Sequence, residues 1–419
     1  YAESGKNGIH YLDNIKIVQV NNSVKNVDIG SNVYVPDRYD TDFSVEILPN
    51  NLGNTVFNAD GKINIEVENK HNQDSVLKIS GKIVSPKGRA AESHEIKLDL
   101  KATEKRSVDL NFGTLEYGVS NIKIKAENEQ GKIKEYTSEV TVINGVGDLG
   151  VNPKIGICDH TLNGHGLEKS GEKINMLANA GMGYIRSTCP WSDIEKTPGA
   201  MSIPDNINKV INQANEVGVE PVLILVGKGA SSTADSPPKT PEGRSKFAKY
   251  AEYLVGATKG RVKYFELWNE WNLDAFNESG ATPEDYVLLM KEVYSAVKKA
   301  NPECVLIGLG GVTNVSNMHE WIERVLKAGG ANYCDAFSVH PYDFSNKPET
   351  AVQVVDKVHD LLKKYNCDDK ELWSTEMGWT ANSWSDSDLA NFAVRYSIMT
   401  LDKLDKNLWY VSQEKQSGN

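Results

Sequence analysis

The stretch "YFELWNEWN" (residues 264–272) begins like a buried strand and ends among polar side chains. Its apolar and aromatic start is typical of a core strand bounded by polar sequence. Glu266, Asn269 and Glu270 interrupt that pattern, and burying an unpaired carboxylate costs free energy or shifts its protonation. Stability does not explain these residues, so the stretch predicts a strand that ends in a functional site.

From residue 150 onward, similar short apolar segments alternate with segments of helical period. The predicted strands cover 154–160, 183–189, 220–227, 264–270, 304–311, 335–342, 371–379 and 407–413. Thr282-Pro283 is typical of a helix start, an N-cap followed by proline at the first helical position. Eight strands with seven intervening helices predict an α/β fold, a (β/α)8 TIM barrel over 148–419. No eighth helix follows the last strand, so we expect the barrel to be truncated there.

The first 150 residues have a different pattern. Segments such as "KINIEVEN" (62–69) and "SNIKIKAEN" (120–128) alternate apolar and polar residues, with Gly- and Asn-rich turns between them. This alternation predicts an all-β immunoglobulin-like or fibronectin-like sandwich over 21–147. Within 1–20, "YLDNIKI" (11–17) resembles the closing strand of jelly-roll carbohydrate-binding modules, which would imply further such modules in a longer parent chain. The alternative is an extra strand of the sandwich.

The composition excludes several classes of partner. A net charge of −11 over 419 residues argues against nucleic acid and anionic lipid, which both need a basic face. No apolar run is long enough to span a membrane. The five cysteines are odd in number and lack CxxC spacing, so we expect small buried hydrophobes rather than a zinc site or a disulfide framework.

Polar and aromatic residues follow the predicted barrel strands at the end where such barrels carry their chemistry. In strand order they are Asp159 and His160, Arg186 and Trp191, Asn269 and Glu270, His340 and Tyr342, Glu376 and Trp379, and Trp409. Trp384 lies in a polar loop after the seventh strand, where a tryptophan is typical of a sugar platform. Asp159 and His160 are either sugar ligands or plain loop residues, and His340 has the alternative of a satisfied core histidine.

Glu270 and Glu376 come from strands 4 and 7, so they face each other across the barrel mouth. Two acids flanking a sugar ring are what glycoside hydrolysis needs, one protonated and one ionised. Arg186 and Tyr342 favour the ionised form of Glu376. Glu270 has no cation beside it and is expected to keep its proton. Asn269 can hold the sugar 2-hydroxyl, and the tryptophans offer flat faces for pyranose rings.

Glu266 shares the strand parity of Glu270 but lies deeper in the predicted barrel. We expect a buried structural acid paired with a cation or a hydroxyl, and Arg186 is a candidate for that cation. Trp321 and Trp373 occupy helix-face and strand-interior positions and are predicted to be core residues.

"FELWNEWN" (265–272) and "STEMGW" (374–379) resemble the acid/base and nucleophile segments of clan A glycoside hydrolases, the retaining (β/α)8 enzymes of which families 39 and 5 are most similar. The resemblance extends over 150–413. It implies Glu270 as acid/base and Glu376 as nucleophile. It also implies that Asn269, Arg186, His340, Tyr342 and Trp409 surround the reacting sugar. Trp271 departs from the pattern, since many members have proline there.

The hypothesis is therefore a secreted, bacterial-type glycoside hydrolase that cleaves a β-linked glycan with retention and without metal or organic cofactor; no signal peptide is visible in the sequence. Carbohydrate is the expected partner. The carboxyl groups of Glu270 and Glu376 should lie about 5–5.5 Å apart. The alternatives are a non-catalytic carbohydrate-binding protein, a metal-dependent barrel hydrolase using Asp159, His160 and His340, and an exo-acting β-glycosidase or β-xylosidase instead of an endo-glycanase.

Overall fold

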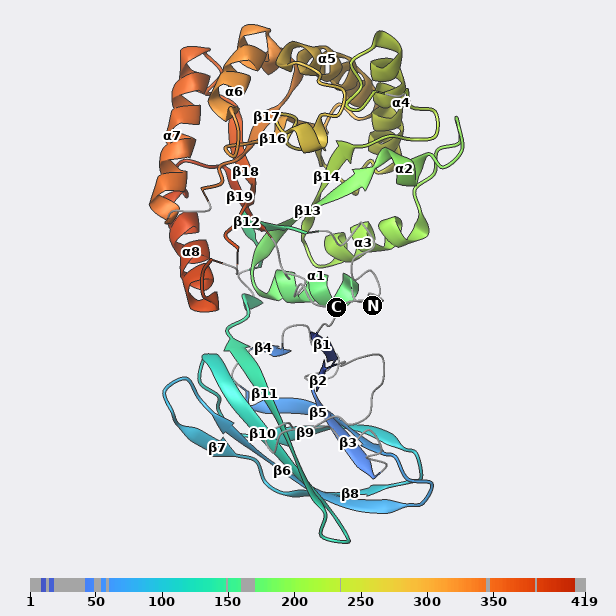
Figure 1. Ribbon diagram of the computed structural model, residues 1–419, viewed down its shortest axis with the longest axis vertical. Helices are drawn as coiled ribbons and strands as arrows, with labels where there is room; N and C mark the ends of the chain where they lie inside the picture. Colours follow the sequence, from blue (N-terminus) through green and yellow to red (C-terminus); the bar gives the residue numbers. More distant parts are fainter. Residues whose placement is uncertain are drawn as a thin grey trace. The chain divides into compact units, whose positions relative to one another are not determined.

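The computed structural model describes residues 9–12, 15–18, 42–48, 54–57, 60–147, 150–159, 170–233, 235–343, 347–380 and 383–410. The chain divides into two compact units, Tyr1–Val142 and Ile143–Asn419 (Figure 1). Among the residues described, none of the helices combines the length and the apolar content needed to cross a bilayer.

The first unit is built from antiparallel strands. A hairpin joins β1 (Ile9–Leu12) to β2 (Ile15–Val18). A three-stranded sheet has the order β3 (Phe43–Ile47), β5 (Lys62–Asn69), β9 (Lys105–Asn111). A six-stranded sheet has the order β4 (Thr55–Phe57), β11 (Ile133–Ile143), β10 (Gly118–Asn128), β6 (Ser75–Val84), β7 (Ala90–Glu92), with β8 (Ile96–Leu100) also on β6.

Period-two alternation explains how these two sheets share one core. Ile63, Ile65 and Val67 of β5 are fully buried, and the polar residues between them face the other way. Ile79 and Ile124 of the larger sheet join the same cluster. The all-β character is thereby confirmed, whereas the immunoglobulin-like or fibronectin-like assignment stays a prediction, as does the likeness of residues 1–20 to a carbohydrate-binding module.

The second unit contains a closed barrel of eight parallel strands in chain order. They are β12 (Asn152–Cys158), β13 (Met182–Pro190), β14 (Glu220–Val226), β15 (Tyr264–Leu267), β16 (Val305–Thr313), β17 (Ala336–His340), β18 (Glu371–Met377) and β19 (Lys406–Tyr410). β19 pairs with β12 and closes the ring. The predicted (β/α)8 barrel is confirmed.

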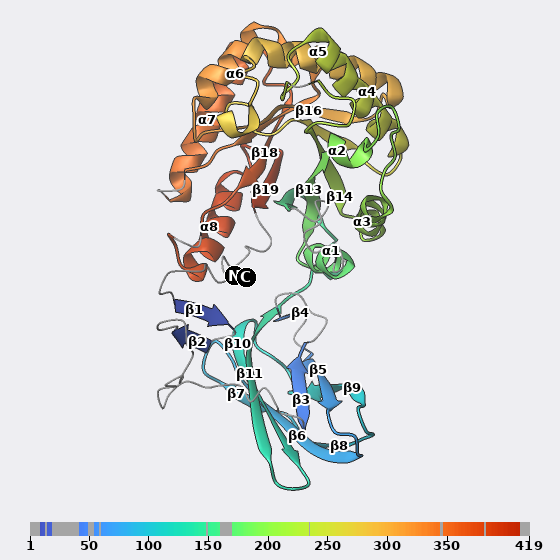
Figure 2. The same cartoon turned by 45° about the vertical axis from the view of Figure 1, so that its right-hand side comes forward.

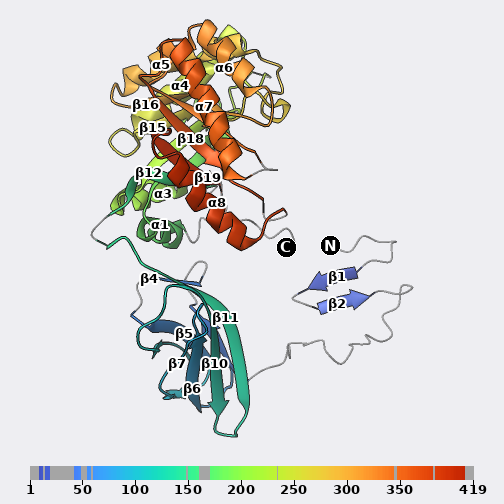
Figure 3. The ribbon, with the colours of Figure 1, turned by 90° about the vertical axis from the view of Figure 1, so that its left-hand side faces the viewer.

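Helices surround the strands (Figure 2, Figure 3). They are α1 (Ser170–Asn179), α2 (Trp191–Ile194), α3 (Asp205–Glu216), α4 (Pro241–Ala257), α5 (Pro283–Ala300), α6 (Met318–Lys327), α7 (Pro348–Lys364) and α8 (Asp386–Met399), with short 3-10 turns η5 (Asp274–Phe276) and η6 (Gly330–Tyr333). The predicted start of α5 is confirmed, because Thr282 and Asp285 form a capping box and Pro283 occupies the first turn.

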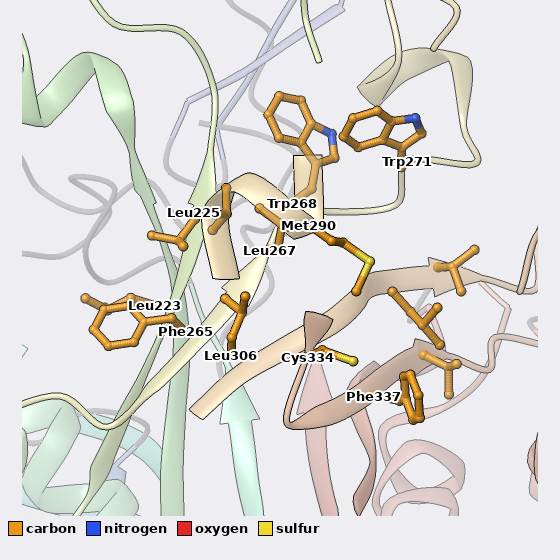
Figure 4. Packing of buried hydrophobic residues seen from close by; sticks show 14 of the residues in the cluster. Leu223, Leu225, Phe265, Leu267, Trp268, Trp271, Met290, Leu306, Cys334 and Phe337 are labelled. Atoms are coloured by element: carbon orange, nitrogen blue, oxygen red, sulfur yellow. The ribbon is translucent and has the colours of Figure 1, made fainter. Parts of the chain in front are cut away.

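Strand parity separates the packed outside of the barrel from its inside. Figure 4 shows Leu223 and Leu225 of β14 and Phe265 and Leu267 of β15 in the cluster between strands and helices. Glu266 lies between two of these residues and therefore points to the barrel interior. A separate cluster fills the lower interior and consists of Tyr184, Val222, Ile307, Ala336, Trp373 and Leu408. This apolar cluster leaves the upper interior, at the carboxyl ends of the strands, for polar side chains such as Glu266.

The two predicted core tryptophans are buried, as expected. Trp373 belongs to the cluster inside the barrel, and Trp321 belongs to the cluster between strands and helices.

Candidate active site

Glu270 follows β15 in a left-handed backbone conformation. Its φ is +46°, and that of Trp268 is +72°. Such angles are costly for residues with a Cβ and persist only where the surroundings enforce them. The Glu270 N–H donates to the Gly310 carbonyl at 2.8 Å. The backbone of the neighbouring strand therefore fixes the point at which this acid leaves the barrel.

That neighbouring strand, β16, is itself irregular. Its register with β17 shifts between Gly308 and Val312, and the residues between them, 309–311, all have positive φ. A Cβ at Gly311 would lie 2.0 Å from His340 Nε2, which is too close for any side chain. The bulge thus needs glycine and creates room for the imidazole of His340.

His340 connects the two halves of the site. Its Nδ1 lies 2.9 Å from Glu270 Oε1, and its Nε2 lies 3.2 Å from Thr375 Oγ1. The Thr375 hydroxyl donates to Glu266 at 2.8 Å, so it accepts from Nε2–H of the imidazole. A single hydrogen bond then links Nδ1 to the Glu270 carboxyl. His340 is fully buried. It is therefore both a hydrogen-bonded core histidine, the alternative considered above, and a direct partner of Glu270.

Glu376 receives three hydrogen bonds. The Tyr342 hydroxyl donates to Oε1 at 2.7 Å, Arg186 Nη1 donates to Oε2 at 3.0 Å, and Cys158 Sγ lies 3.4 Å from Oε2. Burial raises the pKa of Glu376, whereas the charges of His340 and Arg186 lower it. The hydrogen bonds from Tyr342 and Cys158 lower the pKa further, and the net result lies below the usual value for glutamate. The surroundings thus favour a carboxylate.

A bulge in β18 explains how Glu376 comes to face the site. Ser374 pairs with Asn407 but Met377 pairs with Trp409, so β18 has one residue more than β19 here. Thr375 and Glu376, although adjacent, therefore both contact groups of the upper barrel interior. Regular alternation would have turned one of them toward the helices.

Arg186 is fully buried and, besides the thiol of Cys158, contacts three polar side chains. Nε forms an ion pair with Glu266, Nη1 contacts Glu376, and Nη2 donates to Asn269 Oδ1 at 2.9 Å. Glu266 also accepts from Thr375, which confirms a structural acid paired with both a cation and a hydroxyl. Because the amide oxygen of Asn269 faces Arg186, its NH2 group is left to donate elsewhere.

The two acids lie close together. One ligand atom each from Glu270, His340 and Glu376 falls within 4.8 Å of the others, a spacing that can hold a metal ion. However, the guanidinium of Arg186 already contacts Glu376, and both ring nitrogens of His340 have hydrogen-bond partners. A metal cation would have to displace these contacts beside an existing positive charge. The donor set therefore suits proton transfer better than metal binding.

A cavity of about 370 Å³ opens above the acids. Its lining consists of Glu270, Leu273, Val315, Tyr342, Glu376, Gly378, Trp379, Thr380 and Tyr410. Four of the predicted residues, Glu270, Glu376, Tyr342 and Trp379, are among them. Tyr410, Leu273, Val315 and Thr380 were not anticipated.

Tyr410 takes the place that was predicted for Trp409. Leu408 belongs to the cluster inside the barrel, so alternation turns Trp409 outward and Tyr410 inward. Trp409 packs against Trp379, with ring centroids 5.7 Å apart. The pKa of Tyr410 is raised to about 12, first by burial and then by nearby acids including Glu376, so its hydroxyl stays protonated. Strand parity allows only one of Trp409 and Tyr410 to face inward, and the burial of Leu408 inside the barrel decides that it is Tyr410.

Packing corrects the expectation for Trp191. Trp191 is 1% exposed and stacks on Tyr250 with centroids 5.7 Å apart. It is a core residue, because it begins the short helix α2 and its ring packs against α4. Trp384 is half-buried against Phe392, at a centroid distance of 4.8 Å. It is not among the described residues that line the cavity, and its role as a sugar platform stays a prediction.

Asp159 is also corrected. Its carboxylate is buried and lies 2.7 Å from Lys173 Nζ, so a structural ion pair with α1 already uses the group that was expected to bind sugar. His160 lies outside the described residues. Cys158, in contrast, touches Glu376 and was expected only to be a small buried hydrophobe; strand parity alone does not reveal which residue it meets.

Comparisons with known proteins show a family match and a similar fold. The sequence profile of cellulases, glycosyl hydrolase family 5, matches residues 158–415. A search of curated proteins found no match. Among solved structures, a family 39 glycoside hydrolase from the gut symbiont Bacteroides cellulosilyticus WH2 is similar, with a TM-score of 0.72 at 23% identity over 89% of this chain and 76% of that one. A β-glucuronidase from Bacteroides uniformis has a TM-score of 0.41 at 12% identity, over 88% of this chain and 45% of its own.

Proposed function

Because this chain belongs to the cellulase family of glycosyl hydrolases, family 5, it is a glycoside hydrolase, and we propose that it cleaves a β-linked glycan with retention by double displacement. Glu376 attacks the anomeric carbon, and Glu270 gives a proton to the departing glycosidic oxygen. Glu270 then removes a proton from the water that releases the glycosyl group from Glu376. Each of the two reaction steps breaks one bond to the anomeric carbon, and together they return both acids to their starting forms.

The observation that carries the proposal is the unequal environment of two acids over one cavity. Their nearest ligand atoms lie within 4.8 Å of each other, which agrees better with the spacing of about 5–5.5 Å in retaining enzymes than with the longer spacing of inverting ones. Glu376 accepts from a guanidinium and a phenol, so it suits the nucleophile. Glu270 Oε1 instead contacts Nδ1 of the His340 imidazole, a group that can take up and return a proton, so Glu270 suits the acid.

Neighbouring groups supply substrate contacts in this proposal. The free NH2 of Asn269, held by Arg186 through its oxygen, donates to the sugar 2-hydroxyl, a contact that strengthens in the transition state. Tyr342 donates to Glu376 and orients the attacking carboxylate. Trp379 and Tyr410 give the cavity aromatic walls, which suit the apolar faces of pyranose rings. We propose that the protein acts outside the cell on such a glycan.

The first test is turnover of aryl β-glycosides and a panel of β-linked polysaccharides. Glu376→Gln should lower kcat/KM on the order of 10⁴-fold or more, because the nucleophile acts as a unit with its partners. Glu270→Gln should lower it by about 10²–10⁴-fold for natural substrates, and less for aryl glycosides whose leaving group needs little protonation. Glu303→Gln, at an exposed glutamate before β16, is the matched control and should retain activity.

Product analysis decides the remaining alternatives. Proton NMR of the first product should show the β-anomer before mutarotation if the configuration is retained. Product sizes distinguish internal cleavage from release of terminal units. Two results would contradict the proposal: equal inertness of wild type and Glu376→Gln while both bind polysaccharide, which indicates a binding protein, and loss of activity with EDTA, which indicates a metal enzyme.

A further inference from the structure

Cys158 ends β12 and contacts the proposed nucleophile. Its side chain is 2% exposed. Its sulfur lies 3.4 Å from Glu376 Oε2 and 3.1 Å from Arg186 Nη1. The thiol therefore completes a triangle with the carboxylate and the guanidinium that holds it.

We propose that Cys158 is a positioning residue for Glu376. The S–H of Cys158 donates a hydrogen bond to Oε2 of Glu376, while its sulfur accepts one from Arg186. This inference rests on the proposed function, since only there does Glu376 act as the nucleophile. Cys158 touches no reacting atom of the substrate in this role. It acts through the orientation and the charge of the carboxylate.

The direction of these hydrogen bonds follows from the groups involved. Arg186 has five N–H donors and no acceptor; four of the donors reach Glu266, Glu376, Cys158 and Asn269. Cys158 must therefore accept from Arg186, and its own S–H is left for the acceptor beside it, the Glu376 carboxylate. Burial raises the pKa of the Cys158 thiol well above its usual value, so the proton needed for this bond is present.

Five other strands of the barrel contribute a charged or titratable group near Glu376. These groups are Arg186 on β13, Glu270 after β15, His340 on β17 with Tyr342 after it, Tyr410 on β19, and Cys158 itself on β12. Replacing Cys158 leaves all the others in place and removes one donor to the ionised carboxylate. The ionised form is then less stabilised, so protonation of Glu376 sets in at higher pH.

The test is the pH dependence of kcat/KM, whose acidic limb reports the protonation of the free enzyme's nucleophile. Cys158→Ala should move that limb to higher pH by about half a unit to one unit, since a thiol is a weak donor to a charged acceptor. Cys158→Ser keeps a donor and should stay close to wild type. Cys334→Ala removes another buried thiol, one in the cluster between strands and helices, and should leave the limb unmoved. Cys158→Val, which fills the volume without a donor, replaces the alanine variant if that variant does not fold.

The outcomes separate this inference from the function on which it rests. An unmoved limb in Cys158→Ala, or equal shifts in Cys158→Ala and Cys158→Ser or in Cys158→Ala and Cys334→Ala, would overturn the positioning role. Trapping of the wild type with a 2-deoxy-2-fluoro glycoside, followed by mass spectrometry, should independently find the label on Glu376. Absence of that label together with an active Glu376→Gln variant would instead refute the proposed nucleophile.

Discussion

The two acids at the barrel mouth have the same side chain and different partners. Glu376 accepts hydrogen bonds from a buried guanidinium and a phenol, and the pKa of its carboxyl is lowered. Glu270 meets an imidazole whose other nitrogen is held by Thr375. Contacts of this kind are what allows one residue type to serve as nucleophile and as acid within one cavity.

A prediction at this scale concerns the aromatic wall. Tyr410→Ala should lower kcat/KM about 10-fold, because it removes a ring that lines the cavity and because about 1.4 kcal/mol of contact energy corresponds to that factor. Trp409→Ala should leave KM unchanged and lower the free energy of unfolding by up to about 3 kcal/mol, since its ring packs against Trp379. Steady-state kinetics and urea denaturation check both. If instead Trp409→Ala lowers kcat/KM and Tyr410→Ala only lowers the free energy of unfolding, Trp409 is the ring that contacts the sugar.

Two strands owe their role to irregularities rather than to regular pairing. The bulge in β16 holds the backbone of Glu270 through the carbonyl of Gly310 and leaves space for His340 at Gly311. The bulge in β18 lets adjacent residues face the same interior. Regular strands could place only alternate residues at the barrel mouth, so these bulges increase the number of polar groups that meet there.

We expect Gly311→Ala to lower kcat/KM at least 10²-fold. Its Cβ would meet the His340 ring at 2.0 Å, so the imidazole must move away from Glu270, and small misplacements of catalytic groups are costly. Gly260→Ala is the matched control, because Gly260 also has positive φ (+80°) but meets nothing within 4 Å. It should cost about 1 kcal/mol of stability and leave kcat/KM unchanged. Equal loss of activity in both variants would show that backbone strain alone matters.

At the scale of the whole chain, each unit has a hydrophobic core of its own. Among the described residues, the cluster that contains Ile65 consists of residues of the first unit, and the cluster that contains Leu223 consists of residues of the barrel unit. All the described residues of the candidate site lie in the barrel unit. Two cores without shared members predict two separable unfolding transitions.

Ile65→Ala should lower the free energy of unfolding of the first unit by about 2–5 kcal/mol, and with it the temperature of one calorimetric transition. It should leave kcat/KM at low temperature unchanged. Leu223→Ala, at an equally buried position, should lower the temperature of the other transition. The temperature at which activity is lost should fall by the same amount. Differential scanning calorimetry with parallel activity assays checks this. A single transition that shifts in both variants would show that the two units unfold together.

The barrel and the meeting of Glu270 and Glu376 at its mouth could be predicted from the sequence because they depend on patterns that are local in the chain. Eight apolar segments alternating with amphipathic ones dictate parallel strands joined by helices, and polar residues after such strands collect at one rim. The partners of those residues could not be read in this way. Cys158 and Glu376 are 218 residues apart, and Trp409 gave way to Tyr410 because packing inside the barrel sets which side of β19 faces inward. Periodicity is a property of neighbours along the chain, whereas contacts, bulges and burial arise only when distant segments compete for the same space.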